Sequence, residues 1–339
     1  AGAQTINANN GVGDSGSVQV NVNNSITTSG SVSHGVIAMS LAGGGGLTIS
    51  PYDGVYAHGG NGTGSAGAVH VNVASGVSIK TSGSGSTGIW SASIDDPVIN
   101  IAPGASVTGG PGGVGVYFGG PINTLNNSGY VGTADGVSGR SVVSADGSTT
   151  VNNSGITVGD ITLGGSGNVI NNLAAGRMYL TSHPDMGADG VFYNSGFLQF
   201  NPQGLNGLGT LTHTGTLIQL GGGVLGIQYD HQAAATHQSL VTSSISVGVG
   251  SRLELGGSIS PTLINAGLIA PGSAGPTTII ANNGGTLNHA DLGVVNTAIM
   301  TYGLVKDSSG VQLTSTANFA PAGLPTSSSQ IGSAIGSYQ

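Results

Sequence analysis

Aromatic residues recur at one position of a repeated phrase. The phrase runs glycine, β-branched residue, bulky residue and usually a small residue, and its copies occupy residues 35–38, 54–57, 88–91 and 115–118. In an extended strand the β-branched residue would face the core and the bulky residue the solvent. We therefore predict outward-facing Tyr56, Trp90 and Tyr117 as a binding stripe for a glycan or for another copy of the chain. The alternative is that these rings stack on one another and stabilise the fold.

Catalytic chemistry finds little support in the residue pattern. Ser15 lies in a Gly-Asp-Ser-Gly phrase that resembles one found in serine proteases, but a plain turn is the better interpretation. A glycosidase or polysaccharide lyase needs grouped carboxylates. The chain has one glutamate, Glu254, and dispersed aspartates. Neighbouring repeats could still bring Asp135, Asp146 or Asp160 together, so a polysaccharide-acting enzyme stays open as the alternative to a protein without catalytic residues.

Metal and cofactor sites are not predicted. The eight histidines form no i, i+4 pair on a helix, and the glycine runs lack the aspartate spacing of calcium-binding nonapeptides. Asp95 and Asp96, followed by Pro97, are interpreted as a loop and not as a weak cation site.

Short Val/Ile alternations must position the stripe. They begin at Val18, Val69 and Val98, and asparagine pairs follow at 126–127, 152–153 and 171–172. Self-similarity at periods of 20–50 residues is typical of repeat architectures. Asparagine at a fixed corner can adopt a left-handed backbone conformation and can stack its amide on the next coil. Together with the scarcity of hairpin signatures, this pattern favours an all-β parallel β-helix over a sandwich or a propeller.

Composition excludes several partner classes. The 339 residues include 65 glycines but only 5 Lys+Arg against 13 Asp+Glu, a net charge of 5 − 13 = −8. The few scattered cations argue against nucleic acid and against an anionic membrane surface. Apolar residues make up 37% of the chain, which favours a folded protein over a disordered one.

Changes in local composition and in the strand pattern divide the chain into three parts. We predict β-helix repeats with glycine-rich loops over residues 1–226 and a capping region over 227–316, since an open stack of repeats needs a cover. The cap should contain a hairpin around Asp307-Ser-Ser-Gly310. Residues 317–339 are rich in Pro, Ser and Gly and are predicted to be a linker.

The order of three segments resembles the passenger of a type V autotransporter of Gram-negative bacteria. The sequence Gly-Ile-Trp-Ser-Ala-Ser at 88–93 is similar to repeats of long alphaproteobacterial passengers. Residues 208–230 with 239–242 resemble the autochaperone region, and residues 319–335 resemble the connector before the translocator barrel. The resemblance implies a right-handed β-helix, export through the outer membrane to the cell surface, and folding from the C-terminal end. The translocator barrel that would follow the connector is absent from this chain.

These observations lead to one functional hypothesis and two alternatives. The hypothesis is a non-enzymatic adhesin or self-association factor, active in aggregation or biofilm formation, that binds a glycan, a surface receptor or other copies of itself. Many weak contacts along such a protein suffice when many copies act together. The alternatives are the polysaccharide-acting enzyme and a passive stalk.

Overall fold

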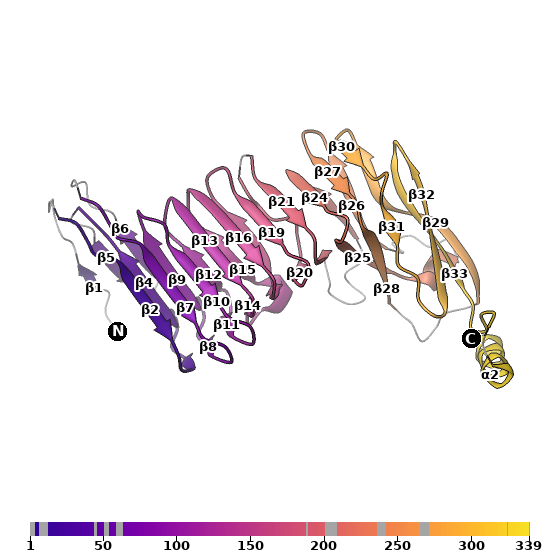
Figure 1. Cartoon of the computed structure of the whole chain (residues 1–339), viewed down its shortest axis with the longest axis horizontal. Coiled ribbons are helices and arrows are strands. Elements are labelled where there is room, and N and C mark those ends of the chain that lie inside the picture. The colour runs from indigo at the N-terminus through magenta and orange to yellow at the C-terminus, as the bar shows by residue number, and fades with distance from the viewer. Residues whose placement is uncertain are drawn as a thin grey trace. The chain divides into compact units, whose positions relative to one another are not determined.

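The computed structural model describes the chain except residues 1–3, 7–12, 44–45, 51–53, 59–63, 188, 201–208, 236–241, 265–270, 324 and 339 (Figure 1). Within it, only the backbone is described for residues 4–6, 46–50, 54–58, 209, 232 and 335–338. The chain forms two compact units, Ala1–Gly196 and Phe197–Gln339. Both units are built almost entirely of β-strands, and parallel pairing prevails.

The first unit is a right-handed parallel β-helix with three sheets, and each of the coils that begin at residues 18, 69, 98, 122 and 148 contributes one strand to each sheet. The asparagine sheet, named after its outward row of asparagines, consists in order of β2 (Val18–Val22), β7 (Val69–Val73), β10 (Val98–Ile101), β13 (Ile122–Asn127), β16 (Ser148–Asn153), β19 (Val169–Asn172) and β21 (Val191–Asn194). The middle sheet consists of β3 (Ile26–Thr28), β8 (Ser78–Thr81), β11 (Ser106–Gly109), β14 (Tyr130–Thr133), β17 (Ile156–Val158) and β20 (Arg177–Leu180).

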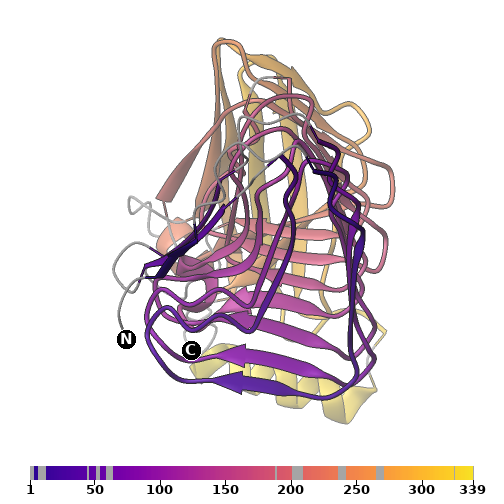
Figure 2. The same cartoon turned by 90° about the vertical axis from the view of Figure 1, so that its left-hand side faces the viewer.

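The third sheet carries the aromatic phrase and is called the aromatic sheet. It consists of β4 (Val36–Ser40), β9 (Ile89–Ser93), β12 (Val114–Phe118), β15 (Arg140–Ser144) and β18 (Asp160–Leu163). A short 3-10 helix, η1 (Gly136–Ser138), precedes β15. Figure 2 shows the coils of this unit lying one behind another. The predicted parallel β-helix is therefore confirmed.

The core consists of inward residues that stack from coil to coil. In the asparagine sheet the register aligns an apolar residue of each strand with that of the next, and the row is Val20, Val71, Ile99, Leu125, Val151, Ile170 and Phe192. From Val71 to Phe192 these side chains are fully buried. Each buried aliphatic side chain contributes about 1.5–3 kcal/mol relative to its exposed state. The row therefore both stabilises the coils and fixes their register, because a slip by one residue would turn it outward.

The glycine that opens the repeated phrase is required by close approach of neighbouring coils. A Cβ on Gly88 would lie 2.6 Å from the carbonyl oxygen of Gly115 and 2.6 Å from Cγ1 of Val107. Gly35 faces Gly88 in the same way, with its Cβ position 2.6 Å from the Gly88 carbonyl oxygen. These two copies of the phrase thus begin with glycine because the neighbouring coil leaves no room for a side chain where the chain enters the aromatic sheet.

An excursion interrupts the first coil. Val18 pairs with Val69, 69 − 18 = 51 residues later, whereas His70 pairs with Val98 only 98 − 70 = 28 residues later. The additional residues include β5 (Gly46–Ser50) and β6 (Gly54–His58), which form a separate antiparallel sheet together with β1 (Gln4–Ile6) from before the first coil. The phrase copy at 54–57 therefore lies in this hairpin and outside the aromatic sheet.

The second unit contains further parallel strands and an antiparallel end. One set of strands is β22 (Phe197–Phe200), β25 (Val224–Tyr229), β28 (Ser258–Leu263) and β31 (Gly293–Val294), and another is β24 (Thr216–Gln219), β27 (Arg252–Leu255) and β30 (Thr286–Asn288). The remaining set is β23 (Gly209–His213), β26 (Ser243–Gly248), β29 (Gly272–Asn283), β33 (Gly310–Ala317) and β32 (Met300–Asp307). The helices are α1 (His231–Ala235) and α2 (Thr326–Tyr338).

The antiparallel end of the second unit acts as a cap for its parallel strands. β32 and β33 form the hairpin predicted around Asp307, and β33 pairs antiparallel with β29. The division expected after residue 226 falls within β25, and helix α2 occupies much of the segment expected to be a linker. Buried Ser315 anchors the cap, because its Oγ lies 2.7 Å from the Tyr229 hydroxyl and 2.8 Å from Nδ1 of His231.

Candidate functional site

The predicted outward row is present on the aromatic sheet. The register aligns Ile37, Trp90, Tyr117, Val143 and Thr162 across β4, β9, β12, β15 and β18. Their inward neighbours Val36, Ile89 and Val116 are buried, whereas Ile37 is exposed and Trp90 and Tyr117 are half-buried. The alternation deduced from the phrase is therefore confirmed for these strands.

The rings of this row also pack against each other. The centroids of Trp90 and Tyr117 are 4.4 Å apart, with the planes tilted by 47°. His34 meets Trp90 edge-on, with centroids 5.4 Å apart and planes at 79°. Such aromatic pairs contribute about 0.5–1.5 kcal/mol beyond the area they bury. Stacking of the stripe on itself, the alternative interpretation of the sequence, thus occurs, and it fixes the orientation of Trp90.

His34 is held in one neutral form by its hydrogen bond. Its Nδ1 accepts the backbone N–H of Thr87 at 2.9 Å, so the ring proton resides on Nε2. Burial lowers the pKa of His34 below its ordinary value. A neutral imidazole therefore supports Trp90 at neutral pH.

A cleft opens beside the two aromatic rings. It has a volume of about 420 Å³, within the range of small-molecule sites. Trp90, Tyr117 and Ile94 line it together with the turn that carries Asp146. Ile94 is 53% exposed, an unusual state for a large aliphatic side chain beside aromatic rings. The cleft therefore offers apolar surface with one acidic group at its edge.

Asp146 is the only carboxylate among the residues that line this cleft. Its Oδ1 accepts the N–H of Gly147 at 2.7 Å, which leaves the second oxygen for another donor, and the side chain is exposed. Aromatic faces combined with a carboxylate acceptor suit a ring that carries both C–H faces and hydroxyl groups, such as a sugar. Hydrolysis of a glycosidic bond ordinarily uses a pair of carboxyl groups, and the lining of this cleft supplies one.

Tyr56 does not join Trp90 and Tyr117. Its strand β6 pairs antiparallel with β5, with Tyr56 opposite Thr48, in the separate three-stranded sheet. The expectation of one stripe through all four copies of the phrase is therefore wrong for this copy. The physical reason is the excursion in the first coil, which removes residues 54–57 from the coil register. The side chain of Tyr56 lies outside the described residues.

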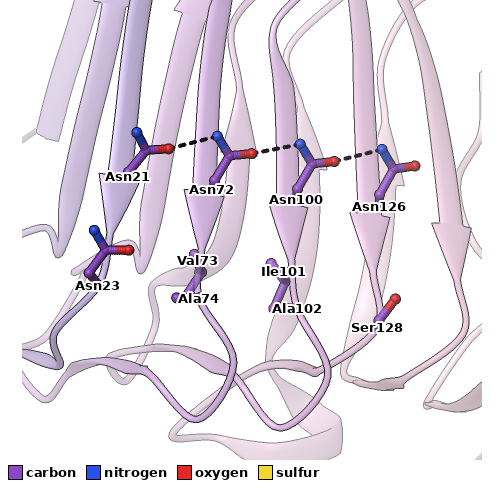
Figure 3. Close-up of a pocket in the computed structure, with 10 residues that line it drawn as sticks. All are labelled: Asn21, Asn23, Asn72, Val73, Ala74, Asn100, Ile101, Ala102, Asn126 and Ser128. Carbon is purple, nitrogen blue, oxygen red and sulfur yellow. Dashed lines mark hydrogen bonds between the residues drawn. The ribbon is translucent and has the colours of Figure 1, made fainter.

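The second surface feature is a row of outward asparagines, which includes the first member of each asparagine pair that was predicted to form a corner. From its second member on, each carboxamide in this outer row donates its Nδ2–H to Oδ1 of the preceding member, at 2.8–2.9 Å. The row is Asn21, Asn72, Asn100, Asn126, Asn152 and Asn171, and Figure 3 shows its first four members. The predicted stacking of amides between coils is confirmed. Consecutive residues of a strand point to opposite faces of the sheet, so the Asn-Asn pairs in the sequence could have predicted two rows of asparagines, one on each face.

The inner row confirms this alternation. Asn127, Asn153, Asn172 and Asn194 are buried, and Nδ2 of each of the first three donates to Oδ1 of the next member of the row at 2.7–2.8 Å. The predicted left-handed backbone at these asparagines is wrong. Both rows lie within β-strands, and among the described residues other than glycine only Val32 and Asp189 have positive φ. Side-chain ladders, rather than turn conformation, account for the asparagines.

A groove follows the outer row in the asparagine sheet. It has a volume of about 650 Å³ and lies between the carboxamides of Asn21, Asn72, Asn100 and Asn126 and the residues two positions later, which are small except for Asn23 (Figure 3). These small residues include Ala74, Ala102 and Ser128. Neither of these two clefts is lined by more than one carboxylate.

The remaining candidate residues serve local structure. The Oγ of Ser15 lies 2.8 Å from that of Ser40. Asp135 accepts the N–H of Gly112, and Asp160 accepts from Thr181 and Ser182, so both carboxylates cap turns of neighbouring coils.

The backbone N–H of Asp95 donates to Oγ of Ser93 in a bend between β9 and β10. The described part of the chain contains no group of three or more His, Asp or Glu that could hold a metal ion. In the same residues, no helix is long and apolar enough to span a membrane.

Comparison with known proteins adds no relative: no protein-family model matches the chain, and no curated protein matches its sequence.

Proposed function

We propose that this protein is the passenger of a type V autotransporter, displayed on the cell surface as a non-enzymatic adhesin that binds glycans or promotes self-association. The β-helix of the first unit and the antiparallel cap of the second unit support this proposal. The order of segments in the sequence supports it as well, since repeats precede a capping region and a short C-terminal tail. In the full-length protein a C-terminal translocator barrel would carry the passenger through the outer membrane.

One observation carries the adhesive part of the proposal. Trp90 and Tyr117 are locked together at a centroid distance of 4.4 Å and line an open cleft with Ile94 and Asp146. Rings fixed by their neighbours lose little conformational entropy when a ligand binds, so even a small contact area retains affinity. A saccharide unit would lie against the rings and donate a hydroxyl hydrogen to Asp146.

The cleft is tested with purified protein on a glycan array, followed by titration of the best ligand. Trp90 is the single tryptophan of the chain, so its fluorescence reports directly on occupation of the cleft. We expect the double variant Trp90→Ala/Tyr117→Ala to lose at least about tenfold in affinity. Tyr179→Ala is the matched control, because Tyr179 is an outward tyrosine of the middle sheet.

Bacteria that display the protein should adhere to the ligand-coated surface or aggregate, and the double variant should weaken this. Equal adhesion of the double variant and of the tyrosine control would exclude the aromatic cleft. Absence of adhesion and aggregation in the unaltered protein would favour the passive stalk.

A further inference from the structure

We infer that the groove along the outer asparagine row binds an extended, uncharged polysaccharide, with one sugar for each coil. This site lies on the asparagine sheet and is separate from the aromatic cleft on the aromatic sheet. Its basis is the groove of about 650 Å³ with four carboxamides along one side (Figure 3). It does not depend on the proposed function of the cleft.

The carboxamides of the groove keep unused hydrogen-bonding capacity. An asparagine amide has two N–H donors and an oxygen with two lone pairs. In Asn72 and Asn100 the row uses one N–H and one lone pair, for bonds of 2.8–2.9 Å to the amides on either side. One donor and one acceptor lone pair therefore remain on each of these two side chains, which are half-buried and reached by water.

These groups are also fixed in advance. The amides of Asn72, Asn100 and Asn126 are held by neighbours in both directions along the row, so binding need not order a flexible side chain there, and this lowers the entropic cost of association. The opposite side of the groove is formed by small residues, Ala74 and Ala102, which leave space above the backbone. The groove thus presents a row of pre-ordered carboxamides, whose free N–H groups and oxygen lone pairs recur from coil to coil.

The charge of the surface selects an uncharged ligand. Beside the outer asparagines runs a second outward row on the same strands, composed of Gln19, His70, Val98, Thr124, Thr150, Val169 and Val191. Neither row contains a lysine, arginine, aspartate or glutamate. A polyanion would find no cation here, and the net charge of −8 would repel it. Hydroxyl groups, which both donate and accept, match the free amide groups.

The spacing of the row distinguishes a sugar chain from a peptide. Adjacent coils are about 4.8 Å apart, whereas same-face residues of an extended peptide recur every ~6.6–6.8 Å. A peptide would therefore lose register with the amides within a few residues. An extended chain of equatorially linked pyranose rings advances by close to one coil spacing per sugar. Successive rings are turned over, but each ring carries hydroxyl groups on both edges and so presents one to the amide of its coil. A second copy of this chain fits poorly, because a two-fold contact would place one concave groove on another.

The test uses cello-oligosaccharides from the disaccharide to the hexasaccharide, with xylohexaose as a second neutral probe and oligogalacturonate as the charged one. Binding is measured by isothermal titration calorimetry on the full chain. We expect affinity to rise with each sugar up to four sugars, one for each outer-row asparagine of the groove, and then to level off. Oligogalacturonate should bind at least about tenfold more weakly than the neutral chain of equal length.

Two variants locate the binding. Ala102→Phe fills the groove at a half-buried position without changing an asparagine, and Thr124→Phe places the same ring on the neighbouring outward row. The first should reduce affinity for the hexasaccharide at least about tenfold and the second should leave it unchanged. Thermal unfolding checks that both variants are folded. Trp90→Ala/Tyr117→Ala should bind the neutral hexasaccharides normally, which separates this site from the cleft.

Failure of both neutral hexasaccharides to bind would overturn the inference, as would affinity that is independent of chain length. Equal effects of the two phenylalanine variants would place the binding elsewhere. Sedimentation provides the last check: concentration-dependent dimers that Ala102→Phe abolishes would assign the groove to a second copy of the chain instead.

Discussion

Asn126 and Asn127 are consecutive residues of β13 that carry the same side chain on opposite faces of one sheet. Each amide donates to a counterpart in an adjacent coil, Asn126 to Asn100 and Asn127 to Asn153, and both bonds measure 2.8 Å. Asn127 is buried, and its amide also meets the Ile156 carbonyl oxygen and the Gly129 N–H. Asn126 is half-buried and bonds to amides of the same row. The two ladders therefore have the same hydrogen-bond geometry but different roles. The buried row satisfies polar groups in the core, whereas the half-buried row lies at the surface.

The two rows also run in opposite directions. In the outer row each Nδ2–H donates to the preceding coil, whereas in the inner row it donates to the following coil. Because side-chain amides carry dipoles, two parallel rows of the same direction would add along the helix axis. The antiparallel arrangement of the rows lets these dipoles oppose one another.

The inner row is not required by the fold itself. At the same register position the earlier coils carry Val22, Val73 and Ile101, which are buried, and Ile101 pairs directly with Asn127. An apolar residue therefore suffices where its neighbours are apolar. Once one coil carries an asparagine, the next must satisfy its amide, because a buried polar group without a partner is costly. The outer row faces water and is under no such constraint.

The largest expected effect comes from breaking the inner row. Asn153→Ala removes an acceptor for Asn127 and Thr157 and a donor to Asn172, all of them buried. Unsatisfied buried groups cost about 1–3 kcal/mol each, so we expect a loss of about 2–4 kcal/mol in the free energy of unfolding. Urea denaturation followed by circular dichroism measures it. A loss below that of an outer-row variant would contradict the role assigned to burial.

A smaller effect is expected in the outer row. Asn100→Ala deletes the hydrogen bonds to Asn72 and Asn126, but water can replace the lost partner at these half-buried positions. We expect a loss of about 0.5–1 kcal/mol, measured by the same denaturation. The same variant interrupts the row of carboxamides in the groove, so neutral oligosaccharides should bind more weakly while the protein stays folded. A stability loss as large as that of Asn153→Ala would remove the distinction between the rows.

The parts of this structure that follow from local repetition could be predicted from the sequence. Alternating Val and Ile with recurrent asparagines indicated stacked parallel coils, and the phrase around Trp90 and Tyr117 indicated its outward residues. Repetition failed as a guide at Tyr56, because the sequence carries the phrase but not the coil length that would place it in register. The same limit applies to His34 and Trp90, whose contact depends on the lengths of the intervening turns.

The groove of the outer row and the contacts of Ser315 in the cap could not be predicted from the sequence, because they too depend on residues that no repeat relates. The groove of the outer row depends on small residues at matching positions of separate coils, such as Ala74 and Ala102, and such residues are too common to form a signal. In the cap, Ser315 contacts Tyr229 across 86 residues without any repeat to relate them. The asparagine pairs did contain the needed signal, since consecutive strand residues point to opposite faces.

The smallest expected effect tests the role of burial at a group that titrates. Burial lowers the pKa of His34, so below the ordinary pKa of about 6.5 the unfolded chain takes up a proton before the folded protein does. The contribution of His34 to stability is therefore complete above that pH and declines as the pH falls. Protonation also removes the lone pair of Nδ1 that accepts the Thr87 N–H, which loosens the ring beside Trp90.

The fluorescence of Trp90, followed from about pH 8 to about pH 5, reports this step because imidazolium quenches tryptophan more strongly than imidazole does. We expect a modest decrease with a midpoint below that of a free histidine, and its loss in His34→Gln. His70→Gln, which alters an exposed histidine of the asparagine sheet, should retain the decrease. A transition that survives His34→Gln would show that protonation of the half-buried His34 does not control the fluorescence of Trp90. The hydrogen bond between His34 and Thr87 would then be as easily replaced by water as the amide bonds of the outer row.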